Sequence, residues 1–405
     1  MTSVALESAY YQVPLAQGQS TYLGFHFDGD VFRSLGLPFG SKASPSIFCR
    51  IMNLLWAFLC SLNILCFWYM DDSIIIGKTK ESCNNMTKLL CAVLVWAGVK
   101  KNDKKSKLVP TRVLDYIGIV FDLNLWTMSV RQKTIDKMVK LCSITILAQR
   151  IWSAPVLVRH LQVLIGCCNF AEVVITGLRP LKHYFIGLLR QAERKETVVL
   201  SSQTLFYLKS VVGLCTIANA KPIATFESLL LNQHNHCLAT DASELGYGGW
   251  GISVFGKTFY FHGLWSDLDG FPTSMSIADL ELWTHFMLVD CLLDHVLPGA
   301  SAVCVRIDNM NALSWINHLR CRVDVSNNIH LDRLNWIRNY YLLNEHRGIE
   351  VQTSYIHTDL NVEADSLSRP GFKLTAYLAS LPPDAQRIYI PRQWKRVWLE
   401  KPSSW

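Results

Sequence analysis

Two adjacent aspartates, Asp71 and Asp72, lie between two apolar runs of the sequence, Ile64–Trp68 and Ile74–Ile76. This pattern predicts a tight hairpin with both acids at its tip. Neighbouring carboxylates raise each other's pKa unless a cation neutralises them, and Mg²⁺ prefers oxygen ligands of this kind. The pair therefore indicates a divalent-metal site or, since Asp-Asp is also common in turns, a solvated turn.

Four more acids occupy the ends or faces of elements expected in the C-terminal part. Asp241 and Asp308 each close an expected strand, whereas Glu281 and Asp365 lie on expected helices. In a mixed sheet such positions can converge at one edge and share two metal ions. These ions would activate water and stabilise a leaving 3′-oxygen during phosphodiester cleavage. Taken singly, each acid is also compatible with a surface carboxylate.

The elements that must position the first pair are short and are interrupted by Gly and Pro. We expect strands near Val4–Tyr11, Tyr116–Phe121 and Thr127–Val130, a hairpin near Thr21–Arg33, a helix from around Pro45, and a helix over Lys80–Ala97 that Gly98 ends. Residues 131–215 are expected to be mostly helical.

A different pattern begins near Cys237. Strands are expected at Cys237–Ala242, Gly248–Val254, Thr258–His262, Val303–Asp308 and Glu350–His357, and helices at Ser276–Val296, Ser326–Glu345 and Asn361–Ser368, with a short helix after Asp308. Antiparallel strands followed by alternating helices and strands predict a mixed sheet with helices on its faces. We expect Phe226–His236 to be a linker and the residues from Pro370 onward to be an irregular tail.

The composition is that of a folded chain with large buried cores. Of the 405 residues, 50% are hydrophobic and 18% are charged, which argues against long disorder and predicts two or three domains. The formal net charge of +7 is compatible with a polyanionic partner. The 13 scattered cysteines and the absence of a visible secretory signal favour an intracellular location, cytoplasmic or nuclear.

One uncharged segment, Ile51–Met70, has about the length of a membrane span. Asn53, Ser61 and Asn63 interrupt it, and two aspartates follow immediately. A buried helix followed by a buried strand explains the segment better, so we expect no membrane association. Periodicity alone leaves a membrane protein as an alternative.

Five motifs in the first part of the sequence resemble, in order, those of the palm of reverse transcriptases. They are Ser8–Leu15; Leu37–Gly40 with Ser44, Pro45 and Phe48; Tyr69–Asp72; Gly98–Val99 with Asn102, Lys105 and Ser106; and Leu114–Gly118. Any one of them alone would be a weak signal, whereas all five in this order are specific.

The resemblance implies roles for several side chains. Asp71 and Asp72 would hold two metal ions that align the primer hydroxyl with an incoming deoxynucleoside triphosphate. Tyr10 would exclude a ribose 2′-hydroxyl, and Lys105 would lie near the leaving pyrophosphate. The alternatives are packing on the sheet for Tyr10 and a phosphate-backbone contact within a basic cluster for Lys105. The residues expected to contact the template-primer are Gly40, Lys42, Tyr69 and Met70.

One position departs from the family pattern. The family places a metal-binding aspartate where this sequence has Ala5, which cannot bind a metal. Glu7 is expected on the same strand face but about 6.6 Å further along, which makes it a poor substitute. The fingers that should precede this point are not found. We therefore expect an N-terminally truncated polymerase half whose DNA synthesis is absent or severely weakened.

The C-terminal pattern resembles the ribonuclease H domain of reverse-transcribing elements. The likeness is carried by Thr240–Ser243, Gly246–Gly251, Leu280–Leu282, Asp308–Asn309 and Asn361–Arg369. The last motif points to retrotransposons, and Leu161–Gly166 with Phe170 and Ala171 resembles DIRS-type elements. The resemblance implies hydrolysis of RNA in RNA–DNA hybrids with two Mg²⁺ (or Mn²⁺) ions per active site, held by Asp241, Glu281, Asp308 and Asp365.

Together these features predict an α/β chain with a palm remnant over 1–125, a helical thumb and connection over 126–225, a ribonuclease H-like mixed sheet over 237–369 and a tail over 370–405. The expected partners are an RNA–DNA hybrid, a template-primer, deoxynucleoside triphosphates and a recombinase or integrase of the same element. The alternative is a catalytically inert, nucleic-acid-binding remnant of a retroelement.

Three further features have open interpretations. His357 could assist product release or proton transfer, or it could simply end a strand. The string His234–Cys237 resembles metal ligands in composition, but no second pair stands at a zinc-finger spacing, which favours a linker. A set of basic residues could face a duplex or solvent: Arg150, Arg159, Arg179, Lys182 and Arg190.

Overall fold

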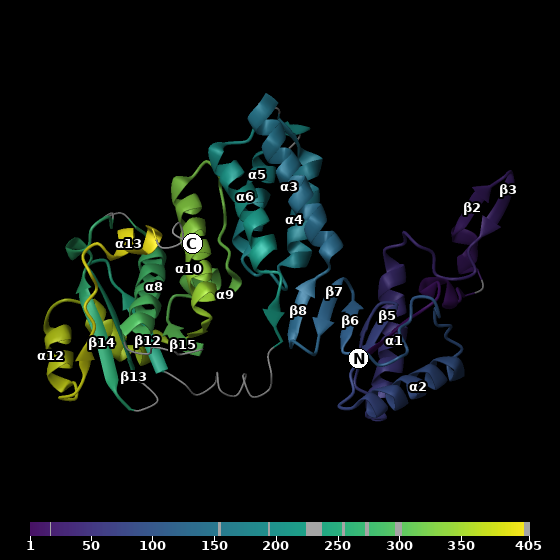
Figure 1. Cartoon of the computed structure of the whole chain (residues 1–405), viewed down its shortest axis with the longest axis horizontal. Coiled ribbons are helices and arrows are strands. Elements are labelled where there is room, and N and C mark those ends of the chain that lie inside the picture. The colour runs from purple at the N-terminus through teal and green to yellow at the C-terminus, as the bar shows by residue number, and fades with distance from the viewer. Residues whose placement is uncertain are drawn as a thin grey trace. The chain divides into compact units, whose positions relative to one another are not determined.

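The computed structural model describes residues 1–16, 18–152, 155–192, 195–223, 237–252, 256–271, 275–295 and 302–400. The chain forms two compact units, drawn in Figure 1. Unit 1 comprises Met1–Arg131 and Ala220–Ile223, and unit 2 comprises Gln132–Asn219 and Ala224–Trp405. Both units combine helices with sheets, which confirms the predicted α/β class. The expected linker Phe226–His236, with His234 and His236, lies outside the described residues.

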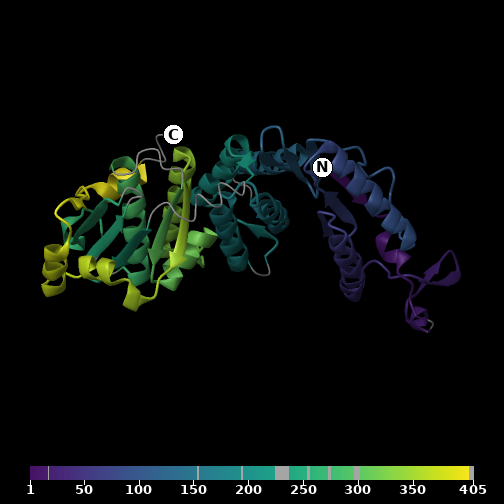
Figure 2. The same cartoon turned by 90° about the horizontal axis from the view of Figure 1, so that it is seen from below.

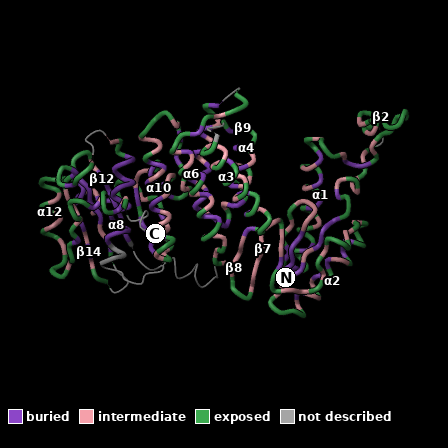
Figure 3. The backbone as a smooth tube through the Cα atoms, turned by 45° about the horizontal axis from the view of Figure 1, so that its top comes forward, coloured by how far each residue is buried: buried purple, intermediate pink, exposed green. Residues whose placement is uncertain are grey.

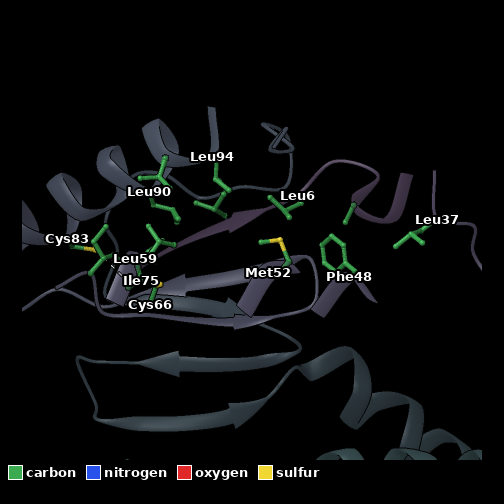
Figure 4. Packing of buried hydrophobic residues seen from close by; sticks show 14 residues of the cluster. Leu6, Leu37, Phe48, Met52, Leu59, Cys66, Ile75, Cys83, Leu90 and Leu94 are labelled. Atoms are coloured by element: carbon green, nitrogen blue, oxygen red, sulfur yellow. Dashed lines mark hydrogen bonds between the residues drawn. The ribbon is translucent and has the colours of Figure 1, made fainter. Parts of the chain in front are cut away.

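Unit 1 is built around a small antiparallel sheet with strand order β1-β5-β4. The strands are β1 (Thr2–Ala5), β4 (Cys66–Tyr69) and β5 (Asp72–Ile75), and the helices that pack against them are α1 (Ala43–Ser61) and α2 (Lys80–Trp96). Leu59 of α1, Leu90 of α2 and Ile75 of β5 meet in one buried cluster (Figure 4). Gly98, at φ +72°, follows α2 in the left-handed conformation expected of a helix-ending glycine.

The predicted strand near Val4–Tyr11 is wrong beyond Ala5. Because Ser8 adopts a left-handed conformation at φ 47° and ψ 44°, the chain leaves the sheet and forms a 3₁₀ helix over Ala9–Gln12. The hairpin expected near Thr21–Arg33 is confirmed as β2 (Gly24–Phe27) and β3 (Asp30–Arg33).

A second sheet of unit 1 has the strand order β11-β8-β7-β6. Its strands are β6 (Val113–Tyr116), β7 (Ile119–Asp122), β8 (Thr127–Val130) and β11 (Lys221–Pro222). The single strand expected over Tyr116–Phe121 is wrong, because Ile117 and Gly118 have positive φ angles and turn the chain between β6 and β7.

Unit 2 begins with four helices, as predicted for residues 131–215. They are α3 (Gln132–Trp152), α4 (Val158–Ala171), α5 (Leu178–Gln191) and α6 (Ser202–Ile217), with short strands β9 (Val156–Leu157) and β10 (Thr197–Val198). Tyr184 of α5 stacks on Tyr207 of α6 with ring centroids 4.1 Å apart. The hydroxyl of Tyr207 donates to Asn335 Oδ1 at 2.6 Å, which links these helices to the C-terminal part of the unit.

The rest of unit 2 is a six-stranded mixed sheet with order β16-β15-β12-β13-β14-β17, flanked by helices (Figure 2). The strands are β12 (Cys237–Ala242), β13 (Gly246–Ile252), β14 (Thr258–Leu264), β15 (Ala302–Ile307), β16 (Glu350–Tyr355) and β17 (Gln386–Arg387). The helices are α8 (Ile277–His295), α9 (Met310–His318), α10 (Asn328–Arg347) and α11 (Val362–Ser368). This is the mixed sheet with helices that the sequence predicts.

The predicted irregular tail is wrong. The chain after Pro370 forms α12 (Phe372–Ser380), adds β17 parallel to β14, and ends its described part with α13 (Trp394–Glu400). Trp394 and Trp398 are buried and pack on Trp283 of α8. Residues 278–291 of α8 are all buried, and the tube in Figure 3 is coloured accordingly. One turn of helix separates the two tryptophans, so both face the core.

The uncharged segment Ile51–Met70 is not one helix, because α1 ends at Ser61 and β4 begins at Cys66. Among the described residues, α1 itself has the length and composition to cross a membrane, which for a single helix is weak support. It is less buried than the sequence predicts: Phe48, Met52 and Leu59 face the core, whereas Leu54 is 75% exposed.

Candidate metal centres

Three of the four predicted C-terminal acids lie together in unit 2. Asp241 is near the end of β12, Asp308 directly follows β15, and Glu281 is on α8. Their carboxylate oxygens lie within 4.8 Å of one another. The two strands are parallel neighbours, so their C-terminal ends reach the same edge of the sheet. The topology thus explains how acids far apart in the sequence form one cluster.

Glu281 has the smallest exposed fraction of the three acids. It is 3% exposed, and its Oε1 accepts a hydrogen bond from the backbone N–H of Ala242 at 3.2 Å. Its Oε2 is buried and has no hydrogen-bond partner among the described residues. Burial, together with the nearby Asp241 and Asp308, raises the pKa of Glu281 well above its usual value. An orphaned carboxylate oxygen of this kind is suited to a metal ion.

The two aspartates also carry raised pKa values. Burial, followed by the charges of Asp308 and Asp365, raises the pKa of Asp241 to about 6. Burial likewise raises the pKa of Asp308. A divalent cation would remove this penalty, because it lets neighbouring carboxylates remain ionised together. The donor set therefore fits an oxygen-ligated divalent ion.

Ser368 positions Asp241, and sequence reasoning did not identify it. Its hydroxyl donates to Asp241 Oδ2 from the end of α11. The helix reaches this position because Gly248 lies beneath it: a Cβ at Gly248 would stand 2.5 Å from the backbone carbon of Leu367. Asn361, at the start of α11, donates to the backbone oxygen of Thr240 at 3.0 Å and fixes the other end. The glycine-rich motif of β13 was the sequence feature that could have indicated this close approach of α11.

Asp365, the fourth predicted ligand, is not part of the cluster. Its carboxylate pairs with Arg369 Nε at 2.7 Å and with Lys373 Nζ at 3.2 Å. Arg369 stands one helical turn further on, which brings its guanidinium to the same face. Asp365 is nevertheless close enough to raise the pKa of Asp241, and the sharing of one metal site by all four acids stays a prediction.

His357 lies at the surface next to this region. It is 63% exposed in its side chain, its Nδ1 stands 3.4 Å from a carboxylate oxygen of Asp359, and it accepts from the backbone N–H of Asp359 at 3.4 Å. These contacts cap the short 3₁₀ helix Thr358–Leu360. The contacts of His357 are thus local, and its two interpretations, a role in product release or proton transfer and a residue that simply ends a strand, stay open.

The N-terminal acids occupy the tip of the β4–β5 hairpin, as predicted. Met70 turns the chain at φ 52°, and Asp71 and Asp72 follow it, both half-buried. Burial and then the charge of Asp71 raise the pKa of Asp72, whereas Lys105 lowers it. Lys105 is therefore close enough to act on the pair electrostatically. Among the described residues, no third carboxylate joins these two.

Ala5 stands directly opposite Asp72 in the antiparallel register of β1 and β5. Its backbone is held in place, because its N–H donates to Ser106 Oγ at 3.1 Å and its oxygen accepts from Asn102 N–H at 2.7 Å. The strand ends at Ala5, so Glu7 is exposed beyond it rather than on the same strand face. The predicted placement of Glu7 is wrong, and the two carboxylates alone do not make a three-ligand centre.

The predicted nucleotide-binding residues line a cavity of about 360 Å³ with Asp71. Tyr10 packs against Phe39 and Phe48 with ring centroids 5.1 and 5.3 Å away, and its hydroxyl is 3.8 Å from Met70 Sδ. Lys105 forms another part of the wall. Of the residues predicted to contact a template-primer, Gly40 has φ +87°, Lys42 and Tyr69 are exposed, and Met70 is half-buried.

Comparison with known proteins concerns first this N-terminal part. Residues 1–121 match the family model of reverse transcriptase (RNA-dependent DNA polymerase). The likeness to this family therefore extends over the first 121 residues. The match covers the β4–β5 hairpin, Ala5 and Lys105.

Several curated proteins are similar to part of this chain. The retrovirus-related Pol polyprotein from transposon gypsy of Drosophila melanogaster is 24% identical to this chain over 119 residues, which is 29% of this chain and 11% of that protein. The polyprotein from transposon 412 of the same organism is 34% identical over 85 residues, which is 21% of this chain and 7% of the relative. Protein P of heron hepatitis B virus is 26% identical over 117 residues, or 29% and 15% of the two chains. The matches thus span small parts of much longer proteins.

Solved structures resemble the chain over a longer stretch at low identity. Two structures of the foamy viral protease-reverse transcriptase, one in complex with dsDNA and one with an RNA/DNA hybrid, each cover 88% of this chain at 16% identity. The match spans 67% of the chain in the dsDNA complex and 44% of the chain in the RNA/DNA complex, with TM-scores of 0.48 and 0.46.

Proposed function

We propose that unit 2 hydrolyses the RNA strand of RNA–DNA hybrids in the presence of Mg²⁺ or Mn²⁺. The observation that carries this proposal is the cluster of Asp241, Glu281 and Asp308, whose carboxylate oxygens lie within 4.8 Å of one another. A cluster of carboxylates that binds two divalent ions promotes in-line displacement at phosphorus. The chain then combines a reverse transcriptase domain with ribonuclease H, as in the Pol polyprotein of a DIRS-type retrotransposon.

The roles of the chain's own residues follow from their contacts. Asp241, Glu281 and Asp308 would hold the ions, and Ser368 would keep the Asp241 carboxylate in one orientation. When bound, the ions supply a nucleophilic hydroxide and neutralise charge on the leaving 3′-oxygen. Asp365 would join the ligand set only after its ion pairs with Arg369 and Lys373 are broken, because these two cations now occupy its carboxylate oxygens.

For the reverse transcriptase domain we infer DNA synthesis that is absent or weak. Its expected substrates are a template-primer and deoxynucleoside triphosphates, with Tyr10 and Lys105 beside the triphosphate. The support is the register that places Ala5 opposite Asp72, where a third carboxylate is needed. We also propose an intracellular location and a recombinase or integrase of the same element as partner. Twelve described cysteines are free, which is consistent with a reducing compartment.

The test is cleavage of a labelled RNA–DNA hybrid by the full chain in Mg²⁺. Asp308→Asn removes one charge at nearly constant size, and we expect it to lower kcat by about 10³-fold, equivalent to about 4 kcal/mol. Asp359→Asn is the matched control, because Asp359 is exposed nearby and outside the cluster. Cleavage that survives in Asp308→Asn at the rate of the control would exclude this active site.

A second candidate function is binding of nucleic acid without catalysis. It is favoured by Ala5 in the N-terminal site and by the ion pairs that keep Asp365 out of the C-terminal cluster. This alternative predicts hybrid binding that does not depend on Mg²⁺ and no cleavage by the wild-type chain in the same assay.

A further inference from the structure

Helix α12 lies beside α11 but is held by a narrow contact. All nine residues of α12 are described, and none of them is buried. Leu374, Tyr377 and Leu378 are half-buried, at the spacing of one helix face. In Figure 3 the tube of α12 accordingly carries the colours of exposed and half-buried residues. A helix with so few buried apolar side chains can move at a small cost in free energy.

A cavity of about 650 Å³ lies between α11, α12 and the 3₁₀ helix that precedes α11. Asp365 and Arg369 line it from one side, and Lys373 and Tyr377 line it from α12. Burial and then the charge of Glu363 raise the pKa of Tyr377 to about 12, which places this side chain close to α11. Helix α12 thus touches α11 without filling the space around Asp365.

Both oxygens of the Asp365 carboxylate are paired with cations, but these cations come from different elements. Oδ1 pairs with Arg369 Nε at 2.7 Å, and Oδ2 pairs with Lys373 Nζ at 3.2 Å. Arg369 follows α11 directly, one helical turn after Asp365, so this pair moves with the helix. Lys373 belongs to α12, and its side chain is 64% exposed. Since an exposed ion pair is weak and is screened by salt, the pair at Oδ2 is the one that can open.

The link between the two helices determines where Lys373 can reach. Gly371 has φ +120° and ψ −149°, a backbone conformation that is open to glycine and strained for other residues. A Cβ at this position would meet nothing within 4 Å, so the requirement for glycine is conformational. The turn stands two residues before Lys373 and directs the start of α12 back toward Asp365, eight residues earlier.

Asp365 remains within electrostatic reach of the three clustered acids. Burial and, to a smaller extent, the charge of Asp365 raise the pKa of both Asp241 and Asp308. A divalent ion at the cluster carries twice the charge of an ammonium group and prefers carboxylate oxygens as ligands. Lys373 and such an ion would therefore attract the same carboxylate in different directions.

We infer that α12 is an autoinhibitory element, in which Lys373 competes with a divalent ion for Oδ2 of Asp365. The inference rests on the proposed nuclease function and adds a control of its metal requirement. While Lys373 holds Asp365, the cluster consists of three carboxylates. When α12 moves away, Asp365 becomes available as a further oxygen donor. The affinity of unit 2 for the ion is then set by the fraction of chains in which this pair is open.

The test measures binding of Mn²⁺ by the full chain without nucleic acid, with free Mn²⁺ read from its electron paramagnetic resonance signal. All proteins carry Asp71→Asn and Asp72→Asn, so that binding at the hairpin does not contribute. We expect Lys373→Gln to lower the Kd by about three-fold relative to this parent chain at low ionic strength, because an exposed ion pair no longer has to be broken. The gain should disappear in about 0.5 M KCl, because salt already screens the pair in the parent.

Two controls separate the ion pair from a general effect of charge. Lys373→Arg keeps the charge and should retain the Kd of the parent, and Lys209→Gln removes an exposed lysine of α6 and should not change it. In an Asp365→Asn background, Lys373→Gln should have no effect, because its partner is absent. An unchanged Kd in Lys373→Gln, or an equal gain in the Asp365→Asn background, would overturn the inference.

Hybrid cleavage then distinguishes the inference from the function on which it rests. In a chain with the wild-type hairpin, Lys373→Gln should lower the Mg²⁺ concentration for half-maximal rate by about three-fold and leave kcat at saturating Mg²⁺ unchanged. Mn²⁺ binding with the expected coupling but no cleavage would refute only the nuclease function. Cleavage with the same Mg²⁺ requirement in both chains would refute only the autoinhibition, and absence of Mn²⁺ binding by the parent would overturn both.

Discussion

The two acidic sites differ in how their carboxylates are brought together. Asp71 and Asp72 are adjacent on the tip of one hairpin and remain half-buried. Asp241, Glu281 and Asp308 come from two strands and a helix, and Asp241 and Glu281 are 4% and 3% exposed. The hairpin is sufficient for a pair of acids, whereas a third ligand depends on the strand beside it, where this chain has Ala5.

The difference shows what desolvation adds to a cluster of like charges. At the hairpin, solvent and Lys105 moderate the repulsion between two carboxylates. In unit 2, burial raises the pKa of all three acids and leaves one oxygen of Glu281 without a partner among the described residues. The second site is therefore the more dependent on a divalent ion.

The largest effect is expected from a substitution that supplies the missing third carboxylate at position 5. In Ala5→Asp, a carboxylate would stand opposite Asp72, and we expect Mg²⁺-dependent primer extension to rise by about 10³-fold over the wild-type chain. Ala5→Asn is the control, because it has nearly the same size without the charge. Equal extension by the two variants would show that the missing carboxylate does not limit the reverse transcriptase domain.

The next effect is the dependence of stability on pH without metal. The pKa of Asp241 is raised from 3.8 to about 6 in the folded chain, so its contribution is complete below the lower value and is lost as pH rises through the higher one. We expect the stability of unit 2 in EDTA to fall by about 3 kcal/mol over this range. Thermal denaturation at a series of pH values measures it.

Two comparisons make this prediction specific. Asp241→Asn should flatten the profile, and Mg²⁺ should reverse the decline, because the ionised carboxylates then bind a cation. Asp72→Asn should change the profile less, since Asp72 is only half-buried. A stability that increases with pH in EDTA would contradict the assignment of these carboxylates as buried and unpaired.

The smallest effect concerns the support of Asp241. Gly248→Ala places a methyl group against the backbone of α11 and should destabilise unit 2 by about 1 to 3 kcal/mol. It should also reduce hybrid cleavage, because Ser368 moves away from Asp241. Gly213→Ala on α6 is the control, since its Cβ would meet open space. Equal melting temperatures and cleavage rates for both variants would refute the close-packing explanation.

Much of the framework was predictable from local patterns. The apolar face and glycine stop of α2, the β4–β5 hairpin with its two acids, and the alternation of strands and helices after Cys237 are readable because they depend on residues near one another. The five short motifs also predicted the likeness to reverse transcriptases, which the family match over residues 1–121 confirms. Composition did not reveal that the segment after Pro370 completes the sheet and core, since its strand has only two residues.

The sequence by itself determined which acids are present, that Asp71 and Asp72 are neighbours, and that position 5 holds an alanine. Only the tertiary structure decided that Asp241, Glu281 and Asp308 meet while Asp365 is diverted to Arg369 and Lys373. It also decided that Ser368 reaches Asp241 across a gap of more than a hundred residues. The physical reason is that local pattern fixes each element, whereas the distance between charged groups depends on how strands pair and how closely a helix lies on the sheet.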